Sequence, residues 1–316
     1  MTISVAIAAY RGEKFIGEEL NSFAAQTIVP DEVVICDDSP DDLTENEVRK
    51  FEKLLNIRYF RNDSQLGVSA NFNKVLSLCS GDVVFLADQD DLWYPDKTAK
   101  FLQYFEKGAK AVFCDSDITD GFGEKSGLTH FESRGYAGLR SEKSGLWCGQ
   151  FEASCRRFPA AGHDMALKKE LLEKLLPVPD LANCHDNFLG LAAAALDEWV
   201  IIPESLGTFR RHGNNTSGAG QKNSLLNAWK AARESAANNS FSWNAKLFQE
   251  VLRRLPDLPE ERVKILSDRV QHSLNRAEMS KKGLRKYSLI LNEIRNGNYF
   301  RFGRGWKNVV QDLFLR

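Results

Sequence analysis

The sequence predicts an α/β protein in which a mostly parallel mixed sheet is flanked by helices, with a helical extension at the C-terminal end. Two observations predict this fold class. Over the first 115 residues, short apolar runs suited to buried strands alternate with segments whose apolar residues recur at helical spacing. Strands that alternate with helices indicate a sheet covered on both faces. From Ser224 onward the pattern is helical throughout.

The predicted strands are short apolar segments, at 3–9, 32–36, 57–61, 82–87, 110–114 and, later in the chain, 200–202. Three of them run into carboxylates: Asp37 and Asp38 follow the second strand, Asp88 the fourth, and Asp115 and Asp117 the fifth. Ligands of parallel sheets bind beyond the carboxyl ends of the strands. The sequence therefore predicts a ligand site at that edge of the sheet.

The predicted helices lie at 14–27, 44–55, 69–79, 166–176 and 187–196. Thr44 and Glu47 have the spacing of a capping box at the start of the second helix, and Gly81 stops the third. Pro95 opens a further helix, because proline suits a first turn. Residues 118–160 show no clear period, and we expect loops there that shape part of a binding site.

Charge divides the chain into two parts. Residues 221–316 contain 19 Lys and Arg against 9 Asp and Glu, whereas residues 1–220 hold the other 23 basic and 34 acidic residues. The net charge of −1 therefore conceals a basic C-terminal part, and the two parts should meet different partners. The segment 217–221, with two glycines, is the predicted boundary.

Cysteine usage and the N-terminus both favour the cytoplasm. The six cysteines include no C-x-x-C pair, and we expect all of them to be reduced. Residues 1–10 lack a basic region and are expected to be a strand rather than a signal peptide. No apolar run approaches the roughly 20 residues that a membrane-spanning helix needs.

Asp88-Gln89-Asp90-Asp91 is the most informative cluster of polar residues. Carboxylates crowded into so short a segment repel one another unless a cation lies among them. One or two of them suffice to hold a divalent ion that also binds a diphosphate. A solvated acidic loop ahead of Pro95 explains the same residues equally well.

Three further segments could contribute to the same site. Asp37-Asp38 could accept hydrogen bonds from a base or a ribose hydroxyl, and Asp186 could act as a general base. Residues 209–215 are rich in side chains that bind phosphate or metal. Taken singly, an acidic turn, a helix N-cap and a polar surface loop explain these residues at least as well.

In their order along the chain, these segments resemble the family 2 glycosyltransferases, which have the GT-A fold, a Rossmann-like α/β design. The resembling stretches are 5–12, 34–39, 66–72, 86–93, 185–188 and 211–215. The string Asp-Gln-Asp-Asp-Leu-Trp at 88–93, with the later His-Asp and Arg-His-Gly-Asn-Asn, is similar to a bacterial rhamnosyltransferase-like branch used in surface polysaccharide assembly.

The resemblance implies an inverting, metal-dependent transfer of a sugar from a nucleoside-diphosphate donor to a hydroxyl of a glycan or lipid-linked glycan. Asp186 would be the catalytic base, while Asp90 and His212 would contact Mg²⁺ or Mn²⁺. The nucleotide would be bound by Ala8, Tyr10, Asp38, Gly67, Asn71, Asp88 and Arg211. Residues 1–220 would then be the catalytic domain, with the donor part at about 1–117 and the acceptor part at about 118–220, and 221–316 a basic helical region.

Three departures from the family pattern leave the donor sugar open. Arg11 stands where the family often has asparagine, Ser39-Pro40 follows the acidic pair where Gly-Ser is common, and His185 stands where glutamate often precedes the catalytic acid. The resemblance favours dTDP-linked L-rhamnose, and UDP-linked hexoses are the alternative.

The C-terminal part interleaves basic and aromatic residues between 281 and 307. That composition suits an anionic membrane surface, where a lipid-linked acceptor would lie. A helical cap with a solvated basic face explains it equally well. No recognised motif supports nucleic-acid binding.

Two other functions compete with sugar transfer. A nucleotidyltransferase that makes the activated sugar would need a glycine-rich, basic triphosphate loop after the first strand, and residues 11–14 are a poor version of one. A catalytically silent, nucleotide-binding scaffold is the second rival. The presence of Asp90 and Asp186 argues against it.

Overall fold

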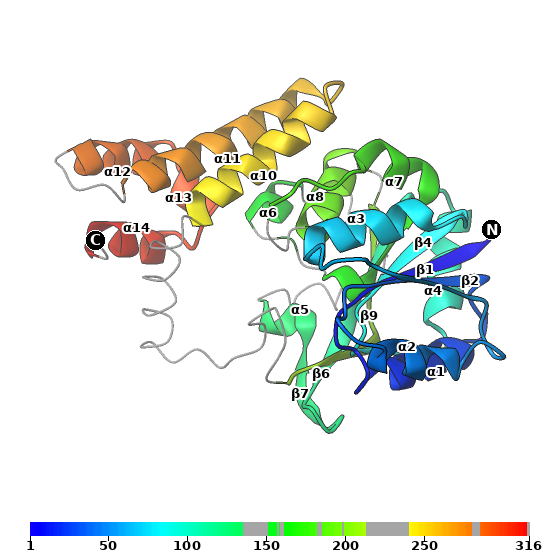
Figure 1. Cartoon of the computed structure of the whole chain (residues 1–316). Helices are drawn as coiled ribbons and strands as arrows, with labels where there is room; N and C mark the ends of the chain where they lie inside the picture. Colours follow the sequence, from blue (N-terminus) through cyan, green and yellow to red (C-terminus); the bar gives the residue numbers. More distant parts are fainter. Residues whose placement is uncertain are drawn as a thin grey trace. The chain divides into compact units, whose positions relative to one another are not determined.

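A computed structural model describes residues 1–134, 151–156, 158, 161–181, 185–197, 199–212, 240–279 and 285–314 (Figure 1). The chain forms two compact units. The first comprises Met1–Cys148, Pro159–Ala193 and Asp197–Gly220, and the second comprises Gly149–Phe158, Ala194–Leu196 and Gln221–Arg316. The second unit thus includes two short segments that precede the boundary predicted at 217–221. The predicted division into donor, acceptor and basic regions stays a prediction.

The first unit is built on a nine-stranded mixed sheet in the order β3-β2-β1-β4-β8-β6-β9-β5, with β7 paired to β6. Its strands are β1 (Ile3–Ala9), β2 (Glu32–Asp37), β3 (Ile57–Arg61), β4 (Val83–Ala87), β5 (Leu92–Trp93), β6 (Ala111–Thr119), β7 (Lys125–Thr129), β8 (Met165–Lys168) and β9 (Trp199–Arg210). The strands β3, β2, β1 and β4 are parallel, whereas β8 is antiparallel to β4 and β6. The predicted mixed α/β sheet is confirmed.

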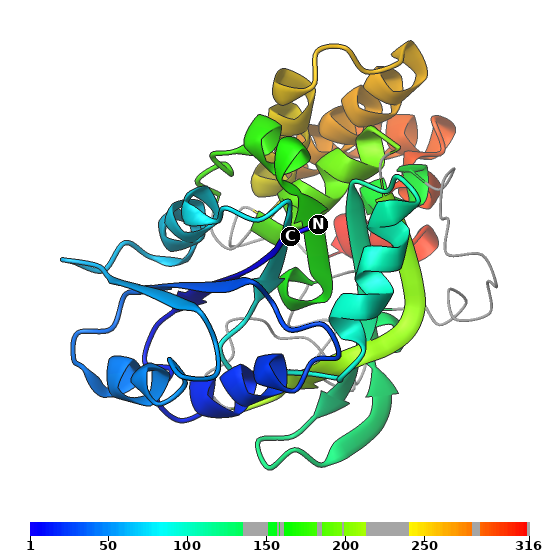
Figure 2. The same ribbon diagram turned by 90° about the vertical axis from the view of Figure 1, so that its right-hand side faces the viewer.

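Helices cover both faces of the sheet, as Figures 1 and 2 show with α1 and α2 on one side and α3 on the other. Alternate residues of β1 (Ile3, Val5 and Ile7) enter one core together with Phe23 of α1 and Phe101 of α4, because successive side chains of a strand point to opposite faces. The helices and 3-10 turn of this unit are α1 (Ile16–Ala24), α2 (Leu43–Arg49), α3 (Val68–Leu78), α4 (Lys97–Glu106), α5 (His130–Ser133), η2 (Gly162–Asp164), α7 (Lys169–Leu175) and most of α8 (His185–Ala195).

The second unit is helical, as predicted. Its described helices are α6 (Phe151–Arg156), α10 (Ser240–Arg254), α11 (Glu260–Glu278), α12 (Arg285–Arg295), α13 (Asn298–Arg301) and α14 (Trp306–Phe314). Met279, Ile290, Tyr299 and Val309 form a small buried core among the last four of them. In the described ranges, every helix is too short or too polar to cross a membrane.

Several predicted strand and helix boundaries were wrong. The segment 166–176 begins as strand β8, because Met165–Lys168 pairs with β4 on one side and β6 on the other, and helix α7 starts only at Lys169. The strand predicted at 110–114 continues to Thr119, so Asp115 and Asp117 lie inside β6 and not beyond its end. The short strand predicted at 200–202 extends from Trp199 to Arg210. In each case tertiary strand pairing outweighed the local pattern.

Two other local predictions were also wrong. Thr44 does not cap α2, which begins at Leu43; its buried hydroxyl instead accepts a hydrogen bond from the Gly12 backbone at 2.9 Å. Residues 118–160 are not loops alone, since they contain β7, α5 and α6. A true capping box does occur there, between Thr129 and Glu132.

Candidate active site

The loop between β4 and β5 carries Asp88, Gln89, Asp90 and Asp91. It lies beside the loop after β1, because β1 and β4 are parallel neighbours. Gln89 joins the two loops: its Oε1 accepts from the Tyr10 backbone N–H at 2.9 Å and its Nε2 donates to the Tyr10 carbonyl at 2.9 Å. A Cβ atom on Gly12 would come 2.5 Å from Gln89 Oε1, so a side chain at position 12 would displace the Gln89 amide from this position.

His212 reaches the same loop from just beyond β9. Its Nε2 lies 2.6 Å from Oδ2 of Asp90, and its ring stacks on Phe15 with 4.9 Å between centroids. Burial and the neighbouring charge of Asp88 raise the pKa of Asp90. The two residues predicted to contact a metal are therefore adjacent in space.

His163 is a central residue of this site that the sequence analysis missed. Its Nδ1 lies 3.2 Å from Oδ2 of Asp91 and 3.5 Å from Oδ2 of Asp88, and its Nε2 lies 3.1 Å from Oδ2 of Asp164. Burial opposes charge on His163, but Asp164 and Asp91 outweigh it and raise the His163 pKa well above its usual value. The positive charge of the His163 imidazole thus offsets the negative charges of Asp88 and Asp91.

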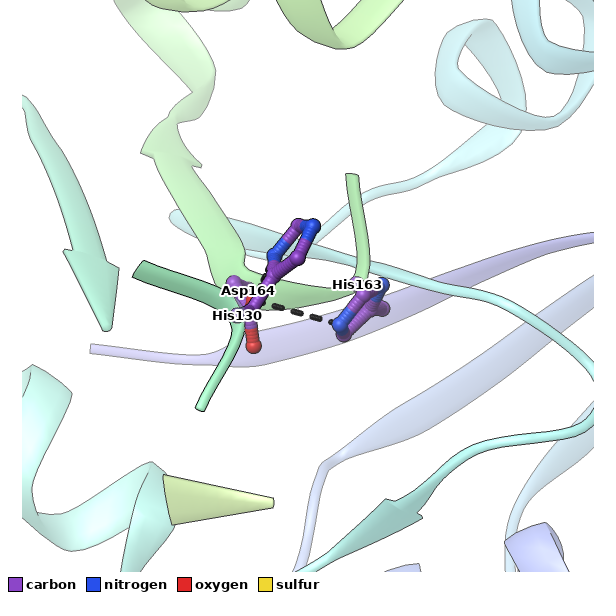
Figure 3. A group of neighbouring side chains, drawn as sticks. All are labelled: His130, His163 and Asp164. Carbon is purple, nitrogen blue, oxygen red and sulfur yellow. Dashed lines mark ion pairs between the residues drawn. The ribbon is translucent and has the colours of Figure 1, made fainter. Parts of the chain in front are cut away.

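Asp164 holds His163 in position through Nε2, the ring nitrogen that does not face Asp88 and Asp91 (Figure 3). Its Oδ2 accepts from Ser116 Oγ at 3.0 Å and lies 3.4 Å from Nδ1 of His130. Figure 3 shows His163 beside Asp164 and His130, and both imidazoles lie near the same oxygen, Oδ2 of Asp164. Burial lowers the pKa of His130 to about 4, so His130 is neutral while His163 is charged.

Glu19 of α1 is a second buried acid with no signal in the sequence. It is fully buried, and no hydrogen-bond partner for either carboxyl oxygen is found among the described residues. Burial and the charge of Asp91 raise the pKa of Glu19 well above its ordinary value. Burial therefore favours the neutral form of Glu19, since an unpaired charge there would be strongly unfavourable.

Asp186, the predicted base, lies in the first turn of α8. Its Oδ1 accepts hydrogen bonds from the Asn187 backbone at 2.6 Å and from the Asn187 amide at 2.8 Å. A Cβ atom on Gly162 would lie 3.8 Å from Asp186 Cβ and 2.9 Å from Nε2 of His185. Because Gly162 directly precedes His163, this contact brings the start of α8 to the same site as the acidic loop.

The predicted nucleotide residues lie around the carboxyl ends of β1 and β2. Asp38 accepts from the backbone N–H of Leu66 at 3.1 Å and of Gly67 at 2.8 Å, and so holds the loop before α3. Gly67 has a φ of 83°, in the region that favours glycine. Asn71 donates to the Cys36 carbonyl at 2.9 Å and thus ties this helix to the sheet.

The remaining predicted residues differ in their surroundings. Ala8 is near the end of β1, and Tyr10, which follows that strand, is 41% exposed. The Arg211 backbone donates to Thr119 at 2.8 Å. The neighbouring Arg210 is buried in β9, where its backbone donates to Asp91 Oδ1 at 2.8 Å and its guanidinium pairs with Glu18. Residues 213–215 of the same motif lie outside the described residues.

The side chains present fit a divalent cation. Asp88, Asp91 and His163 have ligand atoms within 4.8 Å of one another, and Asp90, paired with His212, belongs to the same loop. His163 would bind a cation only in its neutral form, because a metal and a proton compete for the same ring nitrogen. Oδ2 of Asp91 is buried and accepts no hydrogen bond from the described residues. Carboxylate oxygens with imidazole nitrogen are ligands that suit Mg²⁺ or Mn²⁺.

The chain is similar to known proteins in sequence and in fold. The family model described as "Glycosyl transferase family 2" matches residues 4–176. An uncharacterised glycosyltransferase of Nostoc is 27% identical over 227 residues, which cover 68% of this chain and 66% of that protein. The similarity therefore spans just under two thirds of the relative's own length.

Two solved structures resemble the fold of the chain. Residues 1–349 of TarS from S. aureus, solved with UDP, align with a TM-score of 0.54 and 17% identity, over 96% of this chain and 89% of that one. A mannosyltransferase from Pyrobaculum calidifontis, solved with GDP-Man and Mn²⁺, aligns with a TM-score of 0.52 and 18% identity, over 99% of this chain and 84% of that one. At these identities the likeness shows the GT-A fold alone.

Proposed function

This chain belongs to glycosyl transferase family 2, and we propose that it transfers a sugar from a nucleoside diphosphate to a hydroxyl with inversion at the anomeric carbon. One observation carries the proposal. Asp90 with His212, and Asp186 through Gly162, meet around His163 at the carboxyl edge of the sheet. That edge is where ligands of parallel α/β sheets bind.

The donor would bind along the ends of β1, β2 and β4. Asp88, Asp90 and His212 would hold Mg²⁺ or Mn²⁺, which when bound supplies positive charge that stabilises a departing diphosphate. Asp38 would face the nucleotide base while keeping the Leu66–Gly67 turn in place. Tyr10 and Arg211 would contact the nucleoside and its phosphates. The exposure of Tyr10 supports this role, since the residue is 41% exposed.

Asp186 would take the proton from the acceptor hydroxyl as that oxygen attacks the anomeric carbon. In an inverting displacement the base lies on the side of the sugar opposite the leaving group. The two hydrogen bonds from Asn187 engage Oδ1 of Asp186, and among the described residues Oδ2 is the oxygen left for proton transfer. The acceptor would be a hydroxyl of a glycan or a lipid-linked glycan.

For the donor sugar we propose dTDP-linked L-rhamnose first and a UDP-linked hexose second. This order rests on the motifs at 88–93 and 211–215, which resemble a rhamnosyltransferase-like branch. The solved structures with related folds hold UDP and GDP-Man, so a panel of nucleotides is the right first measurement.

The experiment is a thermal-shift panel of UDP, dTDP, GDP and CDP, each with and without Mn²⁺, on the wild type and on Asp90→Ala. A ligand that binds only the folded state stabilises it by about 2.7 kcal/mol at a hundredfold excess over its Kd. We expect a metal-dependent shift for one nucleotide that disappears in Asp90→Ala. Release of that nucleotide from its sugar conjugate that depends on a glycan acceptor, with the sugar recovered on the acceptor, would then establish transfer.

An exposed acid serves as the matched control. Asp180→Ala changes an exposed aspartate of the same unit and should retain the full shift. If no nucleotide stabilises the wild type with or without Mn²⁺, the donor site is refuted. If a nucleotide binds but no sugar is transferred or hydrolysed, the scaffold function replaces transfer.

A further inference from the structure

The last three helices of the second unit, α12 to α14, have an outer surface of unusual composition. From Met279 to the end of the sequence there are nine Lys and Arg and only two carboxylates, Glu293 and Asp312. Each of these carboxylates is only 1% exposed. Of the nine cations, Arg285, Arg295, Arg304 and Lys307 are exposed among the described residues, whereas Arg301 pairs with Glu152 and Asp268. The described outer surface of these helices therefore carries positive charge and no exposed carboxylate of its own.

Both carboxylates are used internally. Asp312 of α14 accepts from Arg276 of α11 at 2.7 and 2.9 Å and from the Tyr299 hydroxyl at 2.9 Å. Glu293 of α12 pairs with His272 and accepts from Asn275 at 2.7 Å. These buried bonds fix the inner faces of α12 and α14, and so determine which side chains point outward.

The outward face of α14 is apolar. Trp306, Val310 and Phe314 are 62%, 54% and 75% exposed, and their spacing of four residues places them on one face of the helix. The opposite face holds Val309 and Asp312, which are buried. The three apolar side chains of this stripe take no part in the buried core of the second unit. Exposed apolar stripes of this kind mark interaction surfaces.

Helix α12 repeats the arrangement. Tyr287 and Leu291, again four residues apart, are 51% and 55% exposed, and Ile290 and Glu293 face inward. Basic side chains border both stripes: Arg285 is 80% exposed at its side chain, and Arg295, Arg304 and Lys307 are exposed. Aromatic and aliphatic side chains among cations are typical of helices that lie in a membrane interface.

We propose that α12 to α14 form a docking surface for an anionic lipid membrane. Charge complementarity favours this occupant, because a symmetric contact between this surface and the same surface of a second copy would bring two positive surfaces together. The apolar stripe favours lipid over nucleic acid, since phosphate backbones are bound by basic and polar groups.

Trp306 and Phe314 enter the acyl boundary, while the headgroups are contacted by Arg285, Arg295, Arg304 and Lys307. This inference deepens the proposed function, because a lipid-linked acceptor would lie in such a membrane. It rests on the proposed function for that link alone.

The experiment is vesicle flotation of the full chain without donor or acceptor. Phosphatidylcholine vesicles are compared with vesicles in which about a third of the lipid is phosphatidylglycerol. We expect binding to the anionic vesicles that weakens at high salt, and at least about a tenfold weaker partition for Trp306→Ser/Phe314→Ser and for Arg304→Glu/Lys307→Glu. The matched controls are Leu54→Ser and Lys53→Glu, which alter exposed residues of the first unit and should bind as the wild type does.

Three outcomes would overturn the proposal: no binding by the wild type, equal binding to neutral and anionic vesicles, or unchanged binding by both double variants. Light scattering would assign the surface to a second copy instead if it showed a concentration-dependent dimer that is lost in either double variant. Thermal melting verifies that the variants fold. Nucleotide shifts on the same samples separate this proposal from the proposed function, because either one can fail while the other holds.

Discussion

Nε2 of His212 lies 2.6 Å from Oδ2 of Asp90, although the two residues are 122 positions apart in the sequence. His212 follows β9 and Asp90 follows β4, and the pairing of β5 with β9 between Leu92 and Thr208 brings the two loops together. The stacking of the His212 ring on Phe15 holds it in this position. The contact thus joins the loop after β4 to the segment after β9.

His212→Ala should weaken metal binding and leave the fold intact. Removing one imidazole ligand is expected to raise the apparent Kd for Mn²⁺ at least about tenfold, measured by titrating Mn²⁺ in the nucleotide thermal-shift assay. His212→Gln distinguishes two roles, because glutamine can hydrogen-bond to Asp90 but is a poor ligand. A wild-type Mn²⁺ titration in His212→Gln would mean that His212 only positions Asp90.

Asp186→Asn should abolish transfer without affecting the donor site. The amide cannot accept the hydroxyl proton, so kcat should fall by about 10²- to 10⁴-fold, while the nucleotide-induced thermal shift stays at the wild-type value. Steady-state kinetics with the donor identified by the panel provide the measurement. Asp180→Asn is the control, since Asp180 is exposed in the same unit. Turnover of Asp186→Asn at the wild-type rate would contradict the assignment.

His163→Leu should destabilise the protein far more than His130→Phe. His163 contacts Asp91, Asp88 and Asp164, and removing one partner of a buried ionic network costs about 3–5 kcal/mol. His130 is neutral, with its pKa lowered to about 4 by burial, and losing its contact with Asp164 should cost only about 1 kcal/mol. Urea unfolding of both variants measures the difference. Equal losses of unfolding free energy in the two variants would show that a charge on His163 does not contribute to stability.

Glu32 should make the first unit sensitive to acid. Burial opposes its charge, but hydrogen bonds from Ser4, Arg58 and Ser80 outweigh burial and lower the Glu32 pKa to about 2. A folded-state pKa below the unfolded value stabilises the fold above about pH 4.3. That stability is lost as the pH falls toward 2.

The test is urea unfolding of Glu32→Gln as a function of pH. At neutral pH the variant should lose about 1–3 kcal/mol of unfolding free energy, and its stability should change less than that of the wild type between pH 4.3 and pH 2. The exposed Glu52→Gln is the control. A wild-type pH dependence in Glu32→Gln would contradict the assignment.

The sequence determined the features that repeat along the chain. Apolar strands alternating with helical patterns predicted the α/β sheet, and carboxylates after β2 and β4 predicted the edge that carries the site. The order of motifs from Ala8 to His212 predicted the family, and the family model at 4–176 confirms it. These features are patterns of neighbouring residues or the order of motifs along the chain, so the amino-acid sequence alone reveals them. The rhamnosyltransferase-like branch and the role of each site residue stay predictions.

Only the tertiary structure decided which distant side chains meet. His163 and Glu19 carried no signal, because a lone histidine in an irregular segment and a glutamate on an amphipathic helix have ordinary explanations. β8 was mistaken for part of a helix because its pairing with β4 and β6 comes from remote residues. Charge acts in the same way: both histidines are buried, and only the nearby carboxylates of Asp164 and Asp91 raise the pKa of His163 above that of His130. Hydrogen-bond registers and desolvation depend on neighbours in space, and the order of residues alone does not specify them.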